Sequence, residues 1–134
     1  MPEWILEVSD LNEYVRRTLA ADPTLRSVRL RGEISNFKRH TSGHWYFTLK
    51  DAQGAISCVI FRQDAVNIPF EPENGMQVIL GGYISLYEKT GQYQFYGEFL
   101  QPVGMGALQI AFEQMKEKLE AEGLFDPDFK RELP

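Results

Sequence analysis

Residues 31 to 51, RGEISNFKRHTSGHWYFTLKD, bring cationic and aromatic side chains close together in the chain. Three basic residues come shortly before three consecutive aromatic residues: Lys38, Arg39 and His40, then Trp45, Tyr46 and Phe47. Aromatic faces stack on unpaired bases and cations contact phosphates, so this mixture has the chemistry that a single-stranded nucleic acid requires. An ordinary charged solvent face is the alternative interpretation.

The charge of the chain is unevenly distributed. The net charge is −5, yet residues 26–62 contain seven Lys or Arg residues and only two Asp or Glu residues. The rest of the chain therefore carries a net charge of −10. A basic segment within an acidic chain favours anion binding, and its acidic flanks would confine a nucleic acid to one face. The charge distribution alone is equally consistent with a charged surface that faces solvent and binds no anion.

Length and composition limit the class of protein. With 134 residues, 43% of them hydrophobic, the chain can bury one ordinary core. No apolar run approaches the roughly 18 residues that a membrane span needs, and MPEWILEVSD at the N-terminus lacks the features of a secretory signal. The one cysteine, Cys58, cannot form an internal disulfide. We therefore expect a cytoplasmic protein without a membrane partner.

The first element that positions these residues is a predicted helix over residues 9–21. Its apolar residues have the spacing of a one-sided helix: Leu11, Tyr14, Val15 and Leu19. Ser9 or Asp10 can cap its start, and Pro23 disfavours helix at the preceding residue, so the helix should end near residue 21.

From about residue 28 the apolar residues alternate with polar ones, which is typical of half-buried strands. Four predicted strands each have apolar residues of one parity: Val28, Leu30 and Ile34; Trp45, Phe47 and Leu49; Ile56, Cys58 and Ile60; Val78, Leu80, Ile84 and Leu86. A fifth covers roughly residues 92–101. Residues 51–54 form a tight turn between the second and third strands, and residues 63–75 form a short irregular connection with room for a helical turn.

Five short strands with a break after the third predict a mainly β protein with flanking helices, built on a five-stranded Greek-key barrel of the OB type. An SH3-like barrel is the nearest alternative. A second amphipathic helix should cover residues 107–122, with Leu108, Phe112, Met115 and Leu119 on one stripe. We predict a barrel domain over residues 1–103, including helix 9–21, followed by a C-terminal helix and linker over residues 104–134.

The pleat of the second and third strands decides which aromatic rings are available to a ligand. If Trp45 and its same-parity neighbours fill the core, Tyr46 faces outward, and by the same logic Phe61 is presented outward beside Arg62. A slip of one residue would reverse these directions. In the fourth strand, Tyr83 and Tyr87 either join this platform or pack across the strands with Tyr93 or Phe95, and Lys89 lies in the turn that follows.

We find no convincing catalytic or metal-binding constellation in the sequence. His40 and His44 lack a third ligand, and Cys58 alternates with apolar residues as a core cysteine would. Gly104 and Gly106 lack the third glycine and the strand of a dinucleotide-binding motif. We therefore expect no catalytic residue, no metal and no cofactor in this chain.

Three segments resemble the N-terminal part of the large subunit of bacterial exodeoxyribonuclease VII: VSDLNEYVRRTLAADPTLRSVRLRGEISNF, SGHWYFTLKD and GMGALQIAFEQMKEKLEAEGLFDPDFKRELP. The resemblance covers nearly the whole chain. It implies an OB-fold domain that binds single-stranded DNA and delivers it to a following catalytic domain. That family degrades single strands from either end into short oligonucleotides, apparently without a divalent metal, and its large subunit associates with several copies of a small helical subunit.

The resemblance also implies binding residues. Phe37, Lys38, Arg39 and His40 match the family's first-loop motif; His44, Tyr46 and Lys50 match its SGH-x-YFTLKD strand; Phe61 and Arg62 end its third strand. Trp45 and Ser57 depart from the family pattern, and the serine could weaken a phosphate contact because relatives often carry a basic residue there. The family's catalytic residues have no counterpart in this chain, which should therefore bind but not cut.

From the residues and the resemblance together, the predicted nucleic-acid-binding residues are Arg31, Phe37, Lys38, Arg39, His40, His44, Tyr46, Lys50, Phe61, Arg62, Tyr87 and Lys89. The expected partners are single-stranded DNA and, through the full-length large subunit, the small subunit. Two alternatives stay open. Helix 107–122 and the Phe125–Phe129 tail could form an assembly surface, with a homodimer of this fragment as one result, or the barrel could bind RNA.

Overall fold

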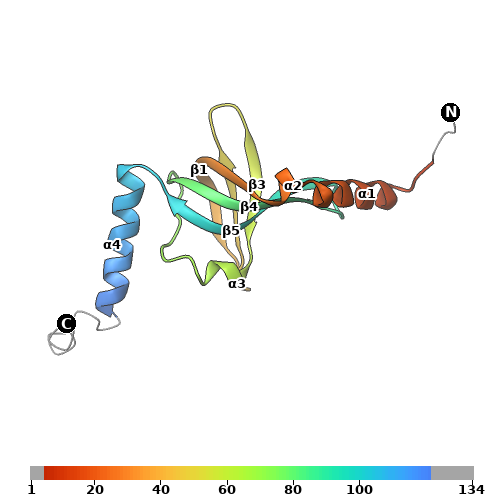
Figure 1. Ribbon diagram of the computed structural model, residues 1–134. Coiled ribbons are helices and arrows are strands. Elements are labelled where there is room, and N and C mark those ends of the chain that lie inside the picture. Colours follow the sequence, from red (N-terminus) through yellow and green to blue (C-terminus); the bar gives the residue numbers. More distant parts are fainter. Residues whose placement is uncertain (1–4, 122–134) are drawn as a thin grey trace.

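The structure of the protein, a computed structural model, describes residues 5–121. Five strands close into a barrel (Figure 1): β1 (Val28–Arg39), β2 (Trp45–Lys50), β3 (Ala55–Ile60), β4 (Gln77–Tyr87) and β5 (Gln92–Pro102). Their order around the barrel is β1-β2-β3-β5-β4, and every neighbouring pair is antiparallel except β3 and β5. The predicted five-stranded OB barrel is confirmed.

Alternating side chains of the strands fill the barrel. Along β2, Trp45, Phe47 and Leu49 are buried, whereas Tyr46 and Lys50 are exposed. The core also contains inward residues of the other four strands: Ile34, Cys58, Ile60, Val78, Leu80, Phe95 and Leu100. The predicted parity of β2 is therefore confirmed, and the hairpin from β2 to β3 pairs as predicted, from Trp45 opposite Ile60 to Lys50 opposite Ala55.

The first strand is longer than its apolar pattern indicated. β1 continues to Arg39, and its register with β2 shifts between Ser35 and Lys38. Asn36 lies at this irregularity with a φ of 53°, in the left-handed region that asparagine tolerates better than most residues. The prediction that residues 37–39 belong to the first loop is wrong, because this bulge allows the strand to continue past them.

The connection from β3 to β4 closes one end of the barrel. It begins with the one-turn helix α3 (Arg62–Ala65), and its later residues Phe70 and Met76 are buried in the same core as the strands. The predicted irregular connection with a helical turn is confirmed. The turn begins at Arg62, one residue before the predicted start of the connection. This connection brings residues 61–71 beside the β1–β2 turn.

The N-terminal helix α1 (Val8–Ala21) lies at the tip of the β4–β5 hairpin (Figure 1). The Asn12 side chain donates a hydrogen bond of 2.8 Å to the Glu88 carbonyl, and Arg16 forms an ion pair with the Glu88 carboxylate. The predicted helix is confirmed, but its N-cap is Glu7 rather than Ser9 or Asp10. Instead, Asp10 takes the third helical position and accepts a hydrogen bond from the Glu7 N–H.

Pro23 has two roles in the connection to β1. It ends α1 as predicted, and it also begins the short helix α2 (Pro23–Arg26), where its fixed φ suits the first helical position. Asp22 caps α2 by accepting a hydrogen bond of 2.8 Å from the Thr24 N–H. The chain therefore enters β1 directly from α2.

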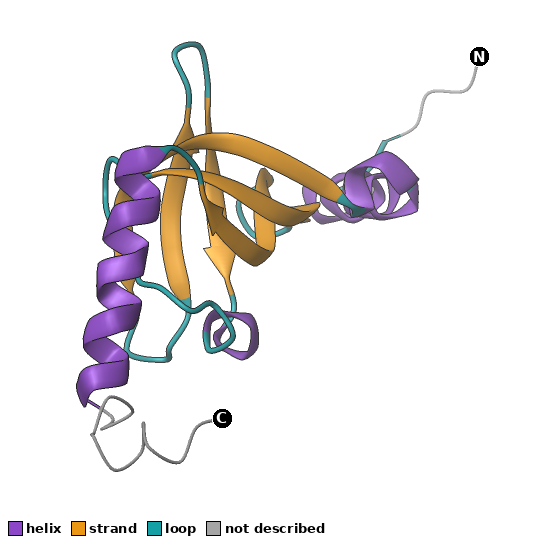
Figure 2. Ribbon diagram, turned by 60° about the vertical axis from the view of Figure 1, so that its left-hand side comes forward, coloured by secondary structure: helices purple, strands orange, loops and turns teal. Residues whose placement is uncertain are grey.

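The C-terminal helix α4 (Met105–Ala121) lies on the opposite side of the barrel from α1 (Figures 1 and 2). It contacts the barrel through the small residues Ala107 and Ala111, which are buried in the core. Leu108 and Phe112, from the predicted apolar stripe, are 51% and 64% exposed. The predicted Phe125–Phe129 tail lies outside the described residues, and within them no helix has the length and apolarity of a membrane span.

Candidate nucleic-acid interface

One row of outward residues crosses all five strands in register. From β1 to β4 the paired positions are Lys38, Tyr46, Val59, Tyr96 and Tyr83. Strands lie about 4.8 Å apart, so the three steps from Tyr46 to Tyr83 span roughly 14 Å. Val59 is buried although it faces outward, so it forms an apolar floor between the rings on either side. The row therefore runs perpendicular to the strands.

The rings of this region contact one another. Phe61 stacks with Tyr96 at a centroid distance of 5.6 Å and an interplanar angle of 20°, and Tyr96 stacks with Tyr83 at 5.4 Å and 18°. The His44 ring meets Phe61 edge-on at 5.3 Å. We call the outward set of His40, His44, Tyr46, Phe61, Tyr83 and Tyr96 the aromatic face.

The turn between β1 and β2 fixes the two histidines. Gly43 has a φ of 93°, which favours glycine, and a Cβ there would come within 2.9 Å of the Arg62 side chain. The His44 Nδ1 accepts a hydrogen bond of 2.8 Å from the Arg62 N–H, so the neutral ring carries its proton on Nε2. The His40 Nδ1 lies 2.8 Å from the Ser42 Oγ, and its ring meets Tyr46 edge-on at 6.0 Å.

Two tyrosines of the aromatic face have pKa values above the ordinary value of tyrosine. Burial raises the pKa of Tyr83, and the nearby carboxylates of Glu98 and Asp64 raise it further. Burial also raises the pKa of Tyr96, with smaller contributions from Tyr83 and Tyr87. The Tyr96 hydroxyl donates a hydrogen bond of 3.1 Å to the Gln94 Oε1. Both rings therefore present neutral, polar-edged surfaces to a ligand.

Several predicted site residues lie together on this surface. Tyr46 is 40% exposed, so its predicted outward direction is confirmed, and Phe61 is half-buried because its ring stacks on Tyr96. His40 and His44 border them, and Lys38 pairs with Tyr46 across the strands. Arg62 follows Phe61 directly at the start of α3. Six rings or cations thus gather around one edge of the aromatic face.

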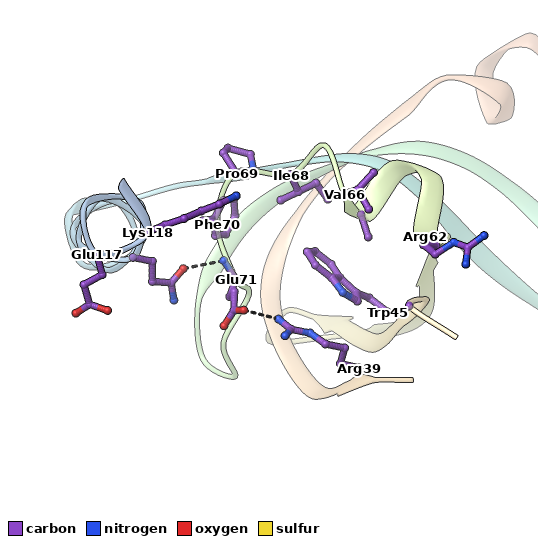
Figure 3. Close-up of a pocket in the computed structure, with 13 residues that line it drawn as sticks. Arg39, Trp45, Arg62, Val66, Ile68, Pro69, Phe70, Glu71, Glu117 and Lys118 are labelled. Atoms are coloured by element: carbon purple, nitrogen blue, oxygen red, sulfur yellow. Dashed lines mark hydrogen bonds and ion pairs between the residues drawn. The ribbon is translucent and has the colours of Figure 1, made fainter. Parts of the chain in front are cut away.

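Arg39 lies on the other side of β1 from Lys38. Its guanidinium forms an ion pair of 2.9 Å with Glu71, and its Cζ lies 5.8 Å from the centroid of the buried Trp45 ring. These residues line a groove of about 730 Å³ between the barrel and α4 (Figure 3). On the wall of the groove, Gln114 of α4 accepts a hydrogen bond of 2.7 Å from the Glu71 N–H. Arg39 is therefore already engaged by the protein.

The remaining predicted residues lie away from the rings. Phe37 points into the barrel and packs against Trp45 and Phe47, with centroid distances of 5.6 and 6.1 Å. Lys50 forms an ion pair of 3.6 Å with Glu33 at the far end of β2, and Arg31 lines a hollow beside that pair. The structure does not bring these residues to the aromatic face.

Tyr87 and Lys89 belong to the β4–β5 hairpin. Tyr87 is 41% exposed and lies four residues beyond Tyr83 on the same side of β4, roughly 13 Å along the strand. Lys89 lies in the turn that α1 contacts. These two residues therefore flank the aromatic face at a distance.

Sequence reasoning missed Tyr96 as a site residue, and it left Tyr83 open between the platform and packing against Tyr93 or Phe95. Tyr83 packs across the strands with Tyr96, not with Tyr93 or Phe95. The signal that could have found Tyr96 is its parity, which is opposite to that of buried Phe95. Cys58 is buried as predicted, and burial raises its pKa to about 12, so its thiol stays protonated and is a poor nucleophile at neutral pH.

Three comparisons place the chain among known proteins. Residues 6–101 match the family of OB-fold nucleic acid binding domains. The exodeoxyribonuclease 7 large subunit of Ruminiclostridium cellulolyticum is 55% identical over 130 residues, which are 97% of this chain and 32% of the relative. The Bacillus subtilis protein of the same name is 47% identical over 127 residues, 95% of this chain and 28% of the relative.

The chain therefore spans about a third of the length of these curated relatives. A solved structure of a replication protein A heterotrimer bound to single-stranded DNA matches with a TM-score of 0.50 and 14% identity, over 72% of this chain and 74% of that chain. At this identity the match concerns the barrel fold.

Proposed function

The chain belongs to the family of OB-fold nucleic acid binding domains, and on this premise we propose that it is the single-stranded DNA-binding domain of an exodeoxyribonuclease VII large subunit. The high identity to proteins of that name supports the assignment. In the full-length protein, the domain would hold a single strand for a nuclease domain that this chain does not contain. The small subunit and a cytoplasmic location belong to the same proposal.

The observation that carries this proposal is the in-register aromatic row from Tyr46 to Tyr83. The row exposes the Tyr46 ring beside Lys38, and it places Tyr96 and Tyr83 two and three strands further around the barrel. Bases can stack on the exposed ring surfaces of this face, and each base stacked on an aromatic side chain contributes about 1–3 kcal/mol. Lys38 and Arg62 lie where they can contact phosphates at one end of the row.

Titration of labelled oligo-dT, followed by fluorescence anisotropy at several salt concentrations, tests the proposal. We expect salt-sensitive binding that weakens about 5- to 150-fold in Tyr46→Ala and in Phe61→Ala, the equivalent of about 1–3 kcal/mol. Tyr93→Ala is the matched control because Tyr93 is an exposed tyrosine outside the aromatic face. Binding that is absent, or equally weakened in all three variants, contradicts the proposal.

Two further experiments define the ligand and the limits of the domain. Matched DNA and RNA strands competing for the same site will show whether the sugar matters, because only RNA offers a 2′-hydroxyl. We expect DNA to compete better. The chain alone should leave labelled single strands intact, and cleavage by the purified chain would overturn the division between binding and catalysis.

The exposed face of α4 favours a second role in assembly. Leu108 and Phe112 project from the side of the helix that does not contact the barrel, and apolar surface of this kind is typical of interaction sites. We propose that this stripe docks on the rest of the large subunit or, in the isolated fragment, on a second copy. Sedimentation of Phe112→Lys beside the unaltered chain tests this, and a monomer in both cases argues against the dimer.

A further inference from the structure

Arg29 and Phe99 form a second cluster of cationic and aromatic groups, on the part of the barrel formed by β1, β4 and β5. The guanidinium Cζ of Arg29 lies 5.6 Å from the centroid of the Phe99 ring, and Phe99 is 42% exposed. We propose that this pair is a second stacking site, which extends the single-stranded nucleic acid path beyond the aromatic face. This inference rests on the proposed function.

A glycine and a bulge create the pair. Arg29 pairs with Gly81 across β1 and β4, and Gly81 pairs with Phe99 across β4 and β5. A Cβ on Gly81 would lie 2.0 Å from the Phe99 ring, so the ring crosses the backbone at a residue that has no side chain. The shift in the β4–β5 register adds Glu98 to β5, which turns Phe99 outward while Leu100 stays buried.

The cluster lies further along the strands from the Tyr83 end of the aromatic row. Phe99 lies three residues beyond Tyr96 on β5, and Gly81 lies two residues before Tyr83 on β4, which correspond to roughly 7–10 Å along the strands. β1, β4 and β5 lie side by side in this part of the barrel (Figure 1). A strand that leaves the Tyr83 end of the row therefore reaches Phe99 without turning away from the surface.

Charge favours a phosphate backbone at this position. Arg26, Arg29 and Arg31 are all exposed, and none of them forms an ion pair within residues 5–121. This contrasts with Arg39 and Lys50, which are paired with carboxylates. Each phosphate contact releases counterions, and stacking on a ring or a guanidinium plane is independent of base identity. The site should therefore add affinity without sequence preference.

Oligo-dT of two lengths tests this site with the whole 134-residue chain. OB folds cover about 4–16 nucleotides, so strands of roughly 5 and roughly 12 nucleotides separate the aromatic face from the longer path. We expect Phe99→Leu, which keeps apolar packing over Gly81, to weaken binding of the longer strand about tenfold and to leave the shorter one unchanged. Tyr93→Ala is again the aromatic control.

Charge variants give an independent measurement. Arg29→Gln should lower the slope of log K against log salt for the longer strand by about 0.7, the value for one phosphate contact on a single strand. Lys116→Gln, which removes one exposed cation from α4, should leave that slope unchanged. Glu98→Gln should strengthen binding of the longer strand, because it removes a carboxylate near Tyr83 and Phe99.

The outcomes separate this inference from the proposed function. If Phe99→Leu and Arg29→Gln bind both strands as the unaltered chain does, while Tyr46→Ala loses affinity, the second site is wrong and the aromatic face stands. If neither strand binds the unaltered chain, both proposals fail. Loss confined to the longer strand in both variants supports the second site.

Discussion

Neighbouring residues of the β1–β2 pair have opposite environments on the two sides of the sheet. Tyr46 is 40% exposed and pairs across the strands with Lys38, whereas Trp45 is 7% exposed and pairs with Arg39. Arg39 is bound by Glu71, but no ion pair involves Lys38 among the described residues. The same combination of a cation and a ring therefore stabilises the protein on one side and is available to a ligand on the other.

The difference shows that residue type alone does not define a nucleic-acid site. A guanidinium already paired with a carboxylate and packed on a buried ring must give up those contacts before it can bind phosphate. The groove beside α4 has a volume of about 730 Å³, yet its cation and its tryptophan are already used by the fold (Figure 3). Availability of the group, not the presence of a hollow, distinguishes the candidate site.

The comparison predicts different stability losses for the two neighbouring rings. Trp45→Ala should lower the free energy of unfolding by about 3–5 kcal/mol, because it leaves a cavity in the core. Tyr46→Ala should change it by less than about 1 kcal/mol, since the ring is outside the core. Urea unfolding of both variants measures the difference, and equal losses would mean that Tyr46 is also a core residue.

Binding of oligo-dT, in contrast to stability, should depend on the Tyr46 ring. Tyr46→Phe keeps the flat ring and should retain oligo-dT affinity within about twofold, whereas Tyr46→Ala loses the stacking contribution of about 1–3 kcal/mol. Isothermal titration at low salt measures both variants. A loss in Tyr46→Phe as large as that in Tyr46→Ala would show that the hydroxyl, not the ring face, makes the contact.

The two cations should differ in salt dependence. Lys38→Gln should lower the slope of log K against log salt by about 0.7, the value for one phosphate contact on a single strand. Arg39→Gln should leave the slope unchanged and lower the free energy of unfolding by at most about 1 kcal/mol, as expected for an exposed ion pair. Equal salt-dependence slopes in the two variants would show that the two sides of the sheet do not differ in phosphate binding.

The smallest effect concerns pH. Because the pKa values of Tyr83 and Tyr96 are raised in the folded protein, their neutral forms contribute stability below the unfolded value of about 10, and this is lost as pH rises through the folded values. The absorbance of tyrosinate should show that these two residues ionise at a higher pH than an ordinary tyrosine, whose pKa is about 10. Tyr83→Phe and Tyr96→Phe should make stability less sensitive to pH there, and an unchanged pH profile would contradict this.

Local alternation predicted the outward direction of Tyr46 and Phe61 because β2 and β3 are short, regular and joined by a tight turn. It gave no direction for Lys38 and Arg39, which the resemblance placed in the first loop, because one extra residue at Asn36 alters the alternation and polar residues give no apolar signal of that shift. The barrel type could be predicted from the number and spacing of the strands.

The stacking of Tyr96 with Tyr83 and Phe61 could not be predicted from local patterns. It depends on β3 and β5 lying side by side in parallel, a contact between residues nearly forty positions apart. The orientation of α4 could not be predicted either, because its buried face consists of Ala107 and Ala111 while Leu108 and Phe112 face solvent. Small residues allow close approach, but they carry little hydrophobic signal.

The attachment of α1 to Glu88 has a kinetic consequence for the domain. Hydrogen bonds and an ion pair from Asn12 and Arg16 hold the β4–β5 hairpin, and with it Tyr87, in one position before any ligand arrives. The entropy of ordering that hairpin is thus lost during folding and not during association. Capture of a passing strand should proceed in a single step at the encounter rate, without a slower rearrangement afterwards.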